Sequence, residues 1–151
     1  MAVEYVSNSI QTVALNNAIL LNDSIPCRKG LIIHENESGV FILRGITNGQ
    51  CYATYQVTFN GNIALPEGAT VVPIAIALTV NGEPKVTSRA IFTPAATEEF
   101  GNVTSTAIVK VPKGCCFTVS VEHVVADENT ATTPAPAIEV QNANLVISRI
   151  A

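Results

Sequence analysis

Hydrophobic and polar residues alternate most regularly between Cys51 and Phe59. On one side of an extended chain fall Cys51, Ala53, Tyr55, Val57 and Phe59, and on the other fall Tyr52, Thr54, Gln56 and Thr58. A period of two residues is typical of a strand with one buried face. We therefore predict a strand over residues 52–59 whose first set of side chains fills the core, while the second set points outwards.

Shorter apolar runs, separated by turn residues, continue this pattern along the chain. They cover residues 9–15, 17–21, 31–34, 40–44, 71–80, 85–92, 103–111, 117–125 and 137–150. Asn81-Gly82 favours a type I′ hairpin between two of these runs, because both central residues of that turn need positive φ. With about eight to ten short strands and no segment of helical period, the sequence predicts an all-β, single-domain antiparallel β-sandwich.

Two predicted strands are apolar on both faces. Ile74, Ile76, Leu78 and Val80 share one side of the first, whereas Ala75 and Ala77 occupy the other. In the second, near the C-terminus, Leu145 and Ile147 oppose Val146 and Ile150. The outward face of an isolated sandwich is expected to be polar. The second face is therefore covered either by a neighbouring subunit or by a loop that crosses a central strand.

Composition agrees with a chain that hides part of its surface. Only 13% of the residues are charged and the net charge is −4, whereas 48% are hydrophobic. A surface this poor in charge favours self-association or a larger assembly.

Nucleic acid is not an expected partner because Arg28-Lys29 is the only basic cluster. A membrane is not expected either, since no window approaches about 18 apolar residues, and the first residues lack the pattern of a secretory signal peptide.

The residues that could carry chemistry form no catalytic or metal-binding pattern. Cys27, Cys51, Cys115 and Cys116 lack the paired spacing of a zinc site, and we expect no metal and no cofactor. Cys51 lies in the apolar phase of its strand, which predicts a buried thiol. A bridge from Cys27 to Cys115 or Cys116 stays open.

The two histidines receive different interpretations. His34 is expected to end a strand at the surface, because it follows Leu31-Ile32-Ile33 and precedes Glu35. His123 shares a phase with valines, which favours a hydrogen-bonded core histidine or one at a subunit interface. In the second case its protonation would loosen that contact. No nucleophile, acid and base fall into a recognisable arrangement, so we do not expect an enzyme.

Several segments together resemble a known family. The run Gly39-Val40-Phe41-Ile42-Leu43 followed by the strand 49–59 resembles the core of the complement C1q/tumour-necrosis-factor jelly roll, closest to bacterial and phage surface domains of the BclA C-terminal type. Residues 76–83, 111–114 and 144–150 resemble the central hairpin, the turn before the penultimate strand and the closing strand of that family. The chain lacks the collagenous Gly-X-Y tract of BclA-like proteins. The resemblance implies a compact homotrimer that is displayed on a surface and does not act as an enzyme.

From this resemblance we expect a jelly-roll core over residues 39–151, to which residues 1–38 add strands or an anchoring arm. The expected trimer interface comprises Tyr52, Thr54, Gln56, Thr58 and His123, and the expected recognition loop begins with Asp127, Glu128, Asn129 and Thr130. The function that we expect is that of a phage virion protein, a capsid decoration or a head fibre, bound to a capsid or another surface scaffold. The alternatives are a receptor- or glycan-binding module and a BclA-like protein of a bacterial spore or cell surface.

Overall fold

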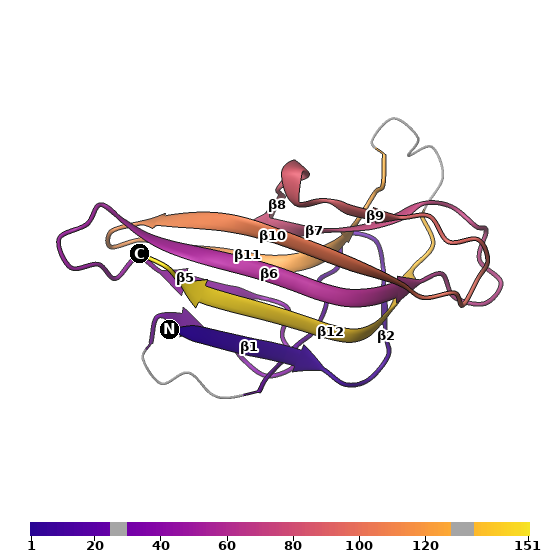
Figure 1. Cartoon of the computed structure of the whole chain (residues 1–151), viewed down its shortest axis with the longest axis horizontal. Coiled ribbons are helices and arrows are strands. Elements are labelled where there is room, and N and C mark those ends of the chain that lie inside the picture. Colours follow the sequence, from indigo (N-terminus) through magenta and orange to yellow (C-terminus); the bar gives the residue numbers. More distant parts are fainter. Residues whose placement is uncertain (25–29, 128–134) are drawn as a thin grey trace.

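Alternating strands build two antiparallel β-sheets that pack face to face (Figure 1). The structure is a computed structural model and describes residues 1–24, 30–127 and 135–151. Its elements are β1 (Ala2–Ser7), β2 (Gln11–Val13), β3 (Asn22–Asp23), β4 (Ile32–Ile33), β5 (Phe41–Arg44), β6 (Tyr52–Ala64), β7 (Ile74–Val80), β8 (Glu83–Pro84), the 3₁₀ turn η1 (Val86–Ser88), β9 (Ala90–Phe92), β10 (Gly101–Pro112), β11 (Cys116–Val124) and β12 (Ile138–Arg149). The predicted all-β sandwich is confirmed. The described ranges hold twelve strands, more than the eight to ten expected, because five have only two or three residues.

The two sheets have the strand arrangement of a jelly roll. Sheet A has the order β10-β6-β12-β1-β3, and β2 pairs with β12 beyond the end of β1. Sheet B has the order β4-β5-β11-β7-β8, and β9 also pairs with β7. From β5 to β7 and from β10 to β12 consecutive strands belong to opposite sheets, so each connection crosses from one layer to the other. Both chain ends lie at one end of the sandwich, which we call the terminal end (Figure 1).

Five residues between Cys51 and Phe59 were predicted to fill the core, and the structure confirms four of them. Ala53, Tyr55, Val57 and Phe59 are fully buried between the sheets. Cys51 is exposed and precedes β6, so the prediction of a buried thiol is wrong. The alternation continues past the end of the ladder at Tyr52↔Pro112, and Cys51 lies in the loop where no second sheet covers it.

The Asn81-Gly82 hairpin is confirmed, but its returning strand is interrupted. Asn81 and Gly82 have φ of 53° and 84°, and Val80 pairs with Glu83. The predicted strand over residues 85–92 is broken by η1, where the Ser88 hydroxyl accepts a hydrogen bond from the backbone N–H of Leu78 (2.9 Å). A side chain thus replaces the ladder partner of β7 at this point.

The N-terminal strands differ most from the expectation. β1 was missed, although Val3 and Tyr5 alternate with Glu4 and the strand pairs with β12 from Ala2↔Ser148 to Ser7↔Ala143. Of the strand expected over residues 9–15 only β2 remains. Residues 17–21 cross between the layers and contribute only isolated bridges, such as Ala18↔Glu122.

The covered second face of β7 is explained within one chain. Ala75 and Ala77 are fully buried and pack with Val124 and Ala126. Of the two alternatives for this face, cover by a neighbouring subunit is therefore not needed for Ala75 and Ala77. In the described part of the chain, no helix has the length and apolar character to span a membrane.

Candidate functional site

The outer face of sheet A consists of short rows of side chains across β10, β6 and β12. Alternation sends Tyr52, Thr54, Gln56, Thr58, Asn60 and Asn62 outwards from β6. The facing residues on β10 are Pro112, Lys110, Ile108, Thr106, Thr104 and Asn102. On β12, Ser148 lies beside Gln56, Val146 beside Thr58 and Asn144 beside Asn60.

Amide and hydroxyl groups occupy the part of this face away from the terminal end. The side-chain amide of Asn102 donates to the side-chain oxygens of Asn60 (3.0 Å) and Asn62 (3.2 Å). The Thr104 hydroxyl donates to the same Asn60 oxygen (2.9 Å), and the hydroxyls of Thr58 and Thr106 are hydrogen-bonded to each other (3.0 Å). We call this set (Thr58, Asn60, Asn62, Asn102, Thr104 and Thr106) the polar ladder. Its hydrogen bonds hold the side chains flat against the strands.

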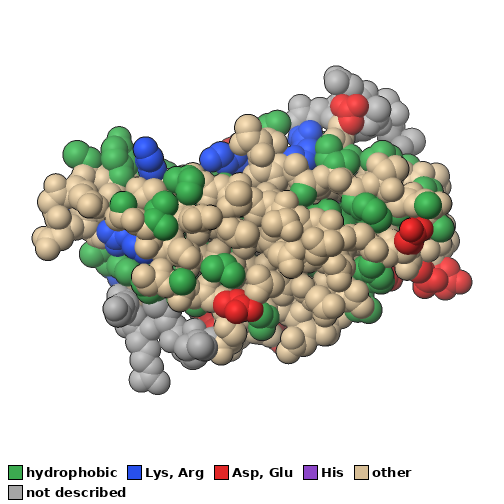
Figure 2. Space-filling model, in the orientation of Figure 1, with side chains coloured by type: hydrophobic (Ala, Val, Ile, Leu, Met, Phe, Trp, Pro, Cys, Tyr) green, Lys and Arg blue, Asp and Glu red, His purple; other side chains and the backbone are tan. Residues whose placement is uncertain are grey.

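Hydrophobic side chains gather at the terminal end of the same face. Tyr52, Ile108 and Ile150 are 50%, 45% and 52% exposed, and the backbone N–H of Ile150 donates to the carbonyl of Thr54 (2.9 Å), which brings Ile150 next to β6. We call these three residues the apolar end. Within the rows from Tyr52 to Asn62, charged side chains on β1, β6, β10 and β12 are confined to Glu4 and Lys110. Figure 2 views this face: backbone and uncharged polar side chains cover most of its centre, and hydrophobic side chains lie toward both ends, the terminal end among them.

The predicted interface residues divide between two places. Tyr52, Thr54, Gln56 and Thr58 lie together on the outer face of sheet A. His123 lies on β11 in sheet B and is only 1% exposed, so the chain itself covers it and it is not available to a neighbouring subunit. The other interpretation of this histidine, a hydrogen-bonded core residue, agrees with the structure.

The environment of His123 explains its burial. Its Nδ1 lies 3.1 Å from the carbonyl of Val13, an acceptor, and therefore carries the proton. The backbone of His123 is hydrogen-bonded to Asn16 and Asn17. Burial lowers the pKa of His123 below its usual value, which two backbone carbonyls only partly offset.

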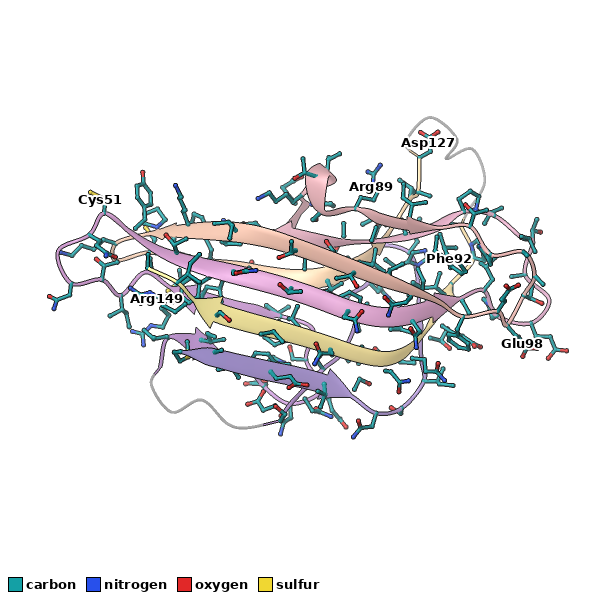
Figure 3. The ribbon with its side chains drawn as sticks, viewed as in Figure 1. Cys51, Arg89, Phe92, Glu98, Asp127 and Arg149 are labelled. Atoms are coloured by element: carbon teal, nitrogen blue, oxygen red, sulfur yellow. The ribbon has the colours of Figure 1, made fainter. Side chains whose placement is uncertain are left out.

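Asp127, the first residue of the expected recognition loop, lies far from the apolar end. Figure 3 shows Asp127 at the end opposite Cys51, which directly precedes Tyr52. Asp127 is exposed. Glu128, Asn129 and Thr130 lie outside the described residues.

The side chain of His34 is buried, so the expectation of a surface histidine is wrong. It is 1% exposed, and its Nδ1 lies 2.5 Å from Oδ1 of Asp23, whose side chain is 20% exposed. Its Nε2 faces the carbonyl of Ser38 at 2.9 Å. Because both ring nitrogens are engaged, His34 offers no nitrogen to a substrate.

The described cysteines are not bridged to one another. Cys51, Cys115 and Cys116 are free and exposed, all at the terminal end, where the backbone N–H of Lys113 donates to the carbonyl of Cys51. Cys27 lies outside the described residues, and so does the possible bridge from it. Within the described ranges, no three His, Cys, Asp or Glu side chains gather into a set that could hold a metal ion.

Sequence reasoning missed most of the polar ladder and, at the apolar end, Ile108. The signal for β10 was present, since Asn102, Thr104, Thr106 and Ile108 alternate with buried residues from Val103 to Val109. What the sequence does not contain is the pairing of β10 with β6, which places these residues beside Asn60 and Asn62.

Known proteins share this fold at low sequence identity. No protein-family model matches the chain, and no curated protein matches it. The chain is similar to the globular domain of zebrafish complement 1qA protein, with 12% identity over 99% of this chain and 97% of that chain and a TM-score of 0.62. It is also similar to Eiger TNF from S. frugiperda (11% identity, 100% and 92% covered, TM-score 0.66) and to murine APRIL at pH 5.0 (10% identity, 99% and 98% covered, TM-score 0.57). The predicted C1q/TNF-like jelly-roll fold is thereby confirmed, and the closer likeness to BclA-type domains stays a prediction.

Proposed function

We propose that this chain is a non-enzymatic structural protein that forms a homotrimer through the outer face of sheet A. The observation that carries the proposal is the character of this face. Its apolar end exposes about half of each of three large side chains, and only two charged residues interrupt the rows beside it. Removing a broad face with few charges from water costs little free energy, because few ions must be desolvated.

The two parts of the face contribute differently to such a contact. Tyr52, Ile108 and Ile150 provide the hydrophobic area, and Tyr52 is the anchor because aromatic side chains dominate the energy of interfaces. Hydrogen bonds within the polar ladder already pair the side-chain oxygens of Asn60 and Asn62, which lowers the cost of covering it. The apolar end therefore supplies the free energy of association, and burial of the polar ladder opposes it only weakly.

The proposed trimer is displayed on a surface, and we favour the outside of a phage virion, as a capsid decoration or head fibre. The low charge, the C1q/TNF-like fold and the lack of an arranged catalytic set in the described residues support a role in assembly. The genes beside this one distinguish the possible surfaces. A major capsid protein there would support the virion, and spore-coat or collagen-like genes would favour a spore.

Light scattering after size-exclusion chromatography tests the assembly. We expect the wild-type protein to elute with three times the mass of its 15.9 kDa chain at micromolar concentration. Tyr52→Glu is expected to convert it to a folded monomer, because an uncompensated carboxylate would be buried at the contact. Ile33→Glu is the matched control, since Ile33 is 47% exposed on sheet B. It is expected to remain trimeric.

Circular dichroism checks whether both variants keep their strands. A wild-type protein that is monomeric at this concentration would refute the trimer. A Tyr52→Glu protein that stays fully trimeric would show that the outer face of sheet A does not carry the contact.

A further inference from the structure

A histidine is enclosed where the two sheets meet along one edge of the sandwich. The imidazole of His34 stacks on the ring of Phe41, with a centroid distance of 4.1 Å and an interplanar angle of 6°. The ring of Tyr5 meets it edge-on at 4.9 Å. Tyr5 belongs to β1 in sheet A and Phe41 to β5 in sheet B, so the imidazole lies between the two layers.

Both nitrogens of this ring face hydrogen-bond acceptors. Nδ1 is 2.5 Å from the carboxyl group of Asp23, and Nε2 is 2.9 Å from the carbonyl oxygen of Ser38. A neutral imidazole has one N–H and one lone pair, so beside an ionised carboxylate it would turn a lone pair toward an oxygen. The geometry needs one more proton, held either by the ring as imidazolium or by the Asp23 carboxyl group. In either case His34 and Asp23 together bind that proton.

The pair connects two segments that form the edge. We call residues 21–23 and 34–38 the edge clamp. The carbonyl of Ser38 also accepts a hydrogen bond from the N–H of Leu21 (3.2 Å), and the N–H of Glu37 donates to the carbonyl of Leu21 (3.1 Å). The Asn22 side chain accepts from the N–H of Glu37 (2.6 Å). Because β3 belongs to sheet A and β4 to sheet B, the edge clamp fastens one sheet to the other.

Acidic ionisable groups lie beside the pair. Asp23 is the ionisable group in direct contact from β3, and Tyr5 is the titratable group that β1 contributes. Phe41 is the contact from β5, and it has no charge. Glu35 and Glu37 are exposed in the turn that follows His34, and their carboxylates add negative potential.

We propose that His34 and Asp23 form a proton-binding site that closes the edge clamp when occupied and opens it when the proton leaves. The sign follows from proton linkage. A folded state that binds one proton more than the open state is stabilised at low pH and loses that stabilisation as pH rises. The edge of the sandwich is thus fastened in acid and loosened in alkali.

Amide hydrogen exchange measured by NMR tests this at the clamp itself. We expect the protection factors of the Leu21 and Glu37 amides, corrected for intrinsic exchange, to fall about tenfold between pH 5.5 and pH 8.5, the loss expected for one charge-assisted hydrogen bond. The amides of Val57 and Phe59 in the centre of sheet A are the internal control, and their protection should not follow this change.

Asp23→Asn gives the sharper comparison. An asparagine amide can donate to Nδ1 of a neutral ring, whose Nε2–H then donates to Ser38, so the clamp no longer needs the extra proton. The Leu21 and Glu37 amides of this variant are expected to keep equal protection at both pH values. His34→Phe retains a stacked ring without either N–H and should give low protection at both.

The ¹⁵N shifts of the wild-type His34 ring decide the matter even if a variant fails to fold. Two protonated nitrogens, or one proton shared with Asp23, at pH 5.5 would support the site. A ring with one bare nitrogen and an ionised Asp23 at that pH would overturn it, as would unchanged protection of Leu21 and Glu37 in the wild type.

Discussion

Replacing Tyr55 with phenylalanine removes one oxygen atom from the core while leaving the ring in place. Tyr55 is fully buried in β6, and its hydroxyl donates to the carbonyl of Arg44 (2.6 Å), with the carbonyl of Leu31 at 3.3 Å. This hydroxyl therefore ties β6, an inner strand of sheet A, to the end of β5 in sheet B. The substitution tests whether that polar link, and not only the burial of the ring, holds the terminal end of the two sheets together.

The expected cost follows from what remains after the change. Phenylalanine keeps nearly all of the packed volume, so the cavity term is small. The lost hydrogen bond costs about 1 kcal/mol, and leaving the carbonyl oxygens less well paired raises the total to about 1–2 kcal/mol. For a chain of this size, 1 kcal/mol corresponds to about 2–4 °C in Tm, so we expect a decrease of about 3–6 °C.

Urea unfolding followed by far-ultraviolet circular dichroism, at one fixed protein concentration, measures the difference. Thr70→Val is the control for loss of an exposed hydroxyl, because Thr70 is exposed between β6 and β7 and its substitution should change the free energy of unfolding by less than about 0.5 kcal/mol. If Tyr55→Phe has the same stability as this control, the hydroxyl does not link the sheets.

The same variant has a consequence at high pH. Burial raises the pKa of Tyr55 above its usual value of 10.0, although the nearby charge of Arg149 opposes the shift. The unfolded chain therefore releases this proton at a pH where the native state keeps it. Stability is fully present below about pH 10 and is lost as pH rises through the native value. Tyr55→Phe is expected to lose this contribution to alkaline unfolding.

Two further changes test other parts of the structure. Because burial lowers the pKa of His123, the unfolded chain binds a proton that the native state does not, so stability should fall as pH drops below about 6.5. His123→Gln should flatten this fall in urea titrations between pH 7 and pH 5, and an unchanged slope would contradict the assignment. Gly45→Ala places a Cβ atom 2.0 Å from the backbone oxygen of Pro112 and should cost about 3 kcal/mol or more, measured by thermal unfolding. Gly49→Ala has open space at a φ of 84° and should cost only about 1–2 kcal/mol, so equal losses would show that the close contact at Gly45 is not the cause.

The alternating pattern of single strands was readable without the structure. The buried side of β6, the outward side from Tyr52 to Thr58 and the Asn81-Gly82 turn follow from local rules, because side chains alternate along any extended chain and few residues adopt positive φ. The same motifs in order along the chain indicated the C1q/TNF-like jelly roll, which the solved structures confirm as a fold.

The local sequence pattern does not predict burial that a distant segment of the chain causes. Ala75 and Ala77 look like an uncovered face, yet Val124 and Ala126 pack on them. His34 looks like a surface residue because it ends an apolar run beside Glu35, yet Asp23, Tyr5 and Phe41 enclose it from three other strands. Neither the order of the strands nor their register is encoded in the local pattern.

By itself the sequence determined which residues of each long strand can share a face. Only the tertiary structure decided which faces meet, and hence which polar groups are paired inside. It brought Asn102 beside Asn60 and Asn62 to form the polar ladder, and it moved His123 from an expected interface into the interior. The physical reason is that strand alternation is a property of one segment, whereas burial and hydrogen bonding across sheets arise from residues far apart in the chain.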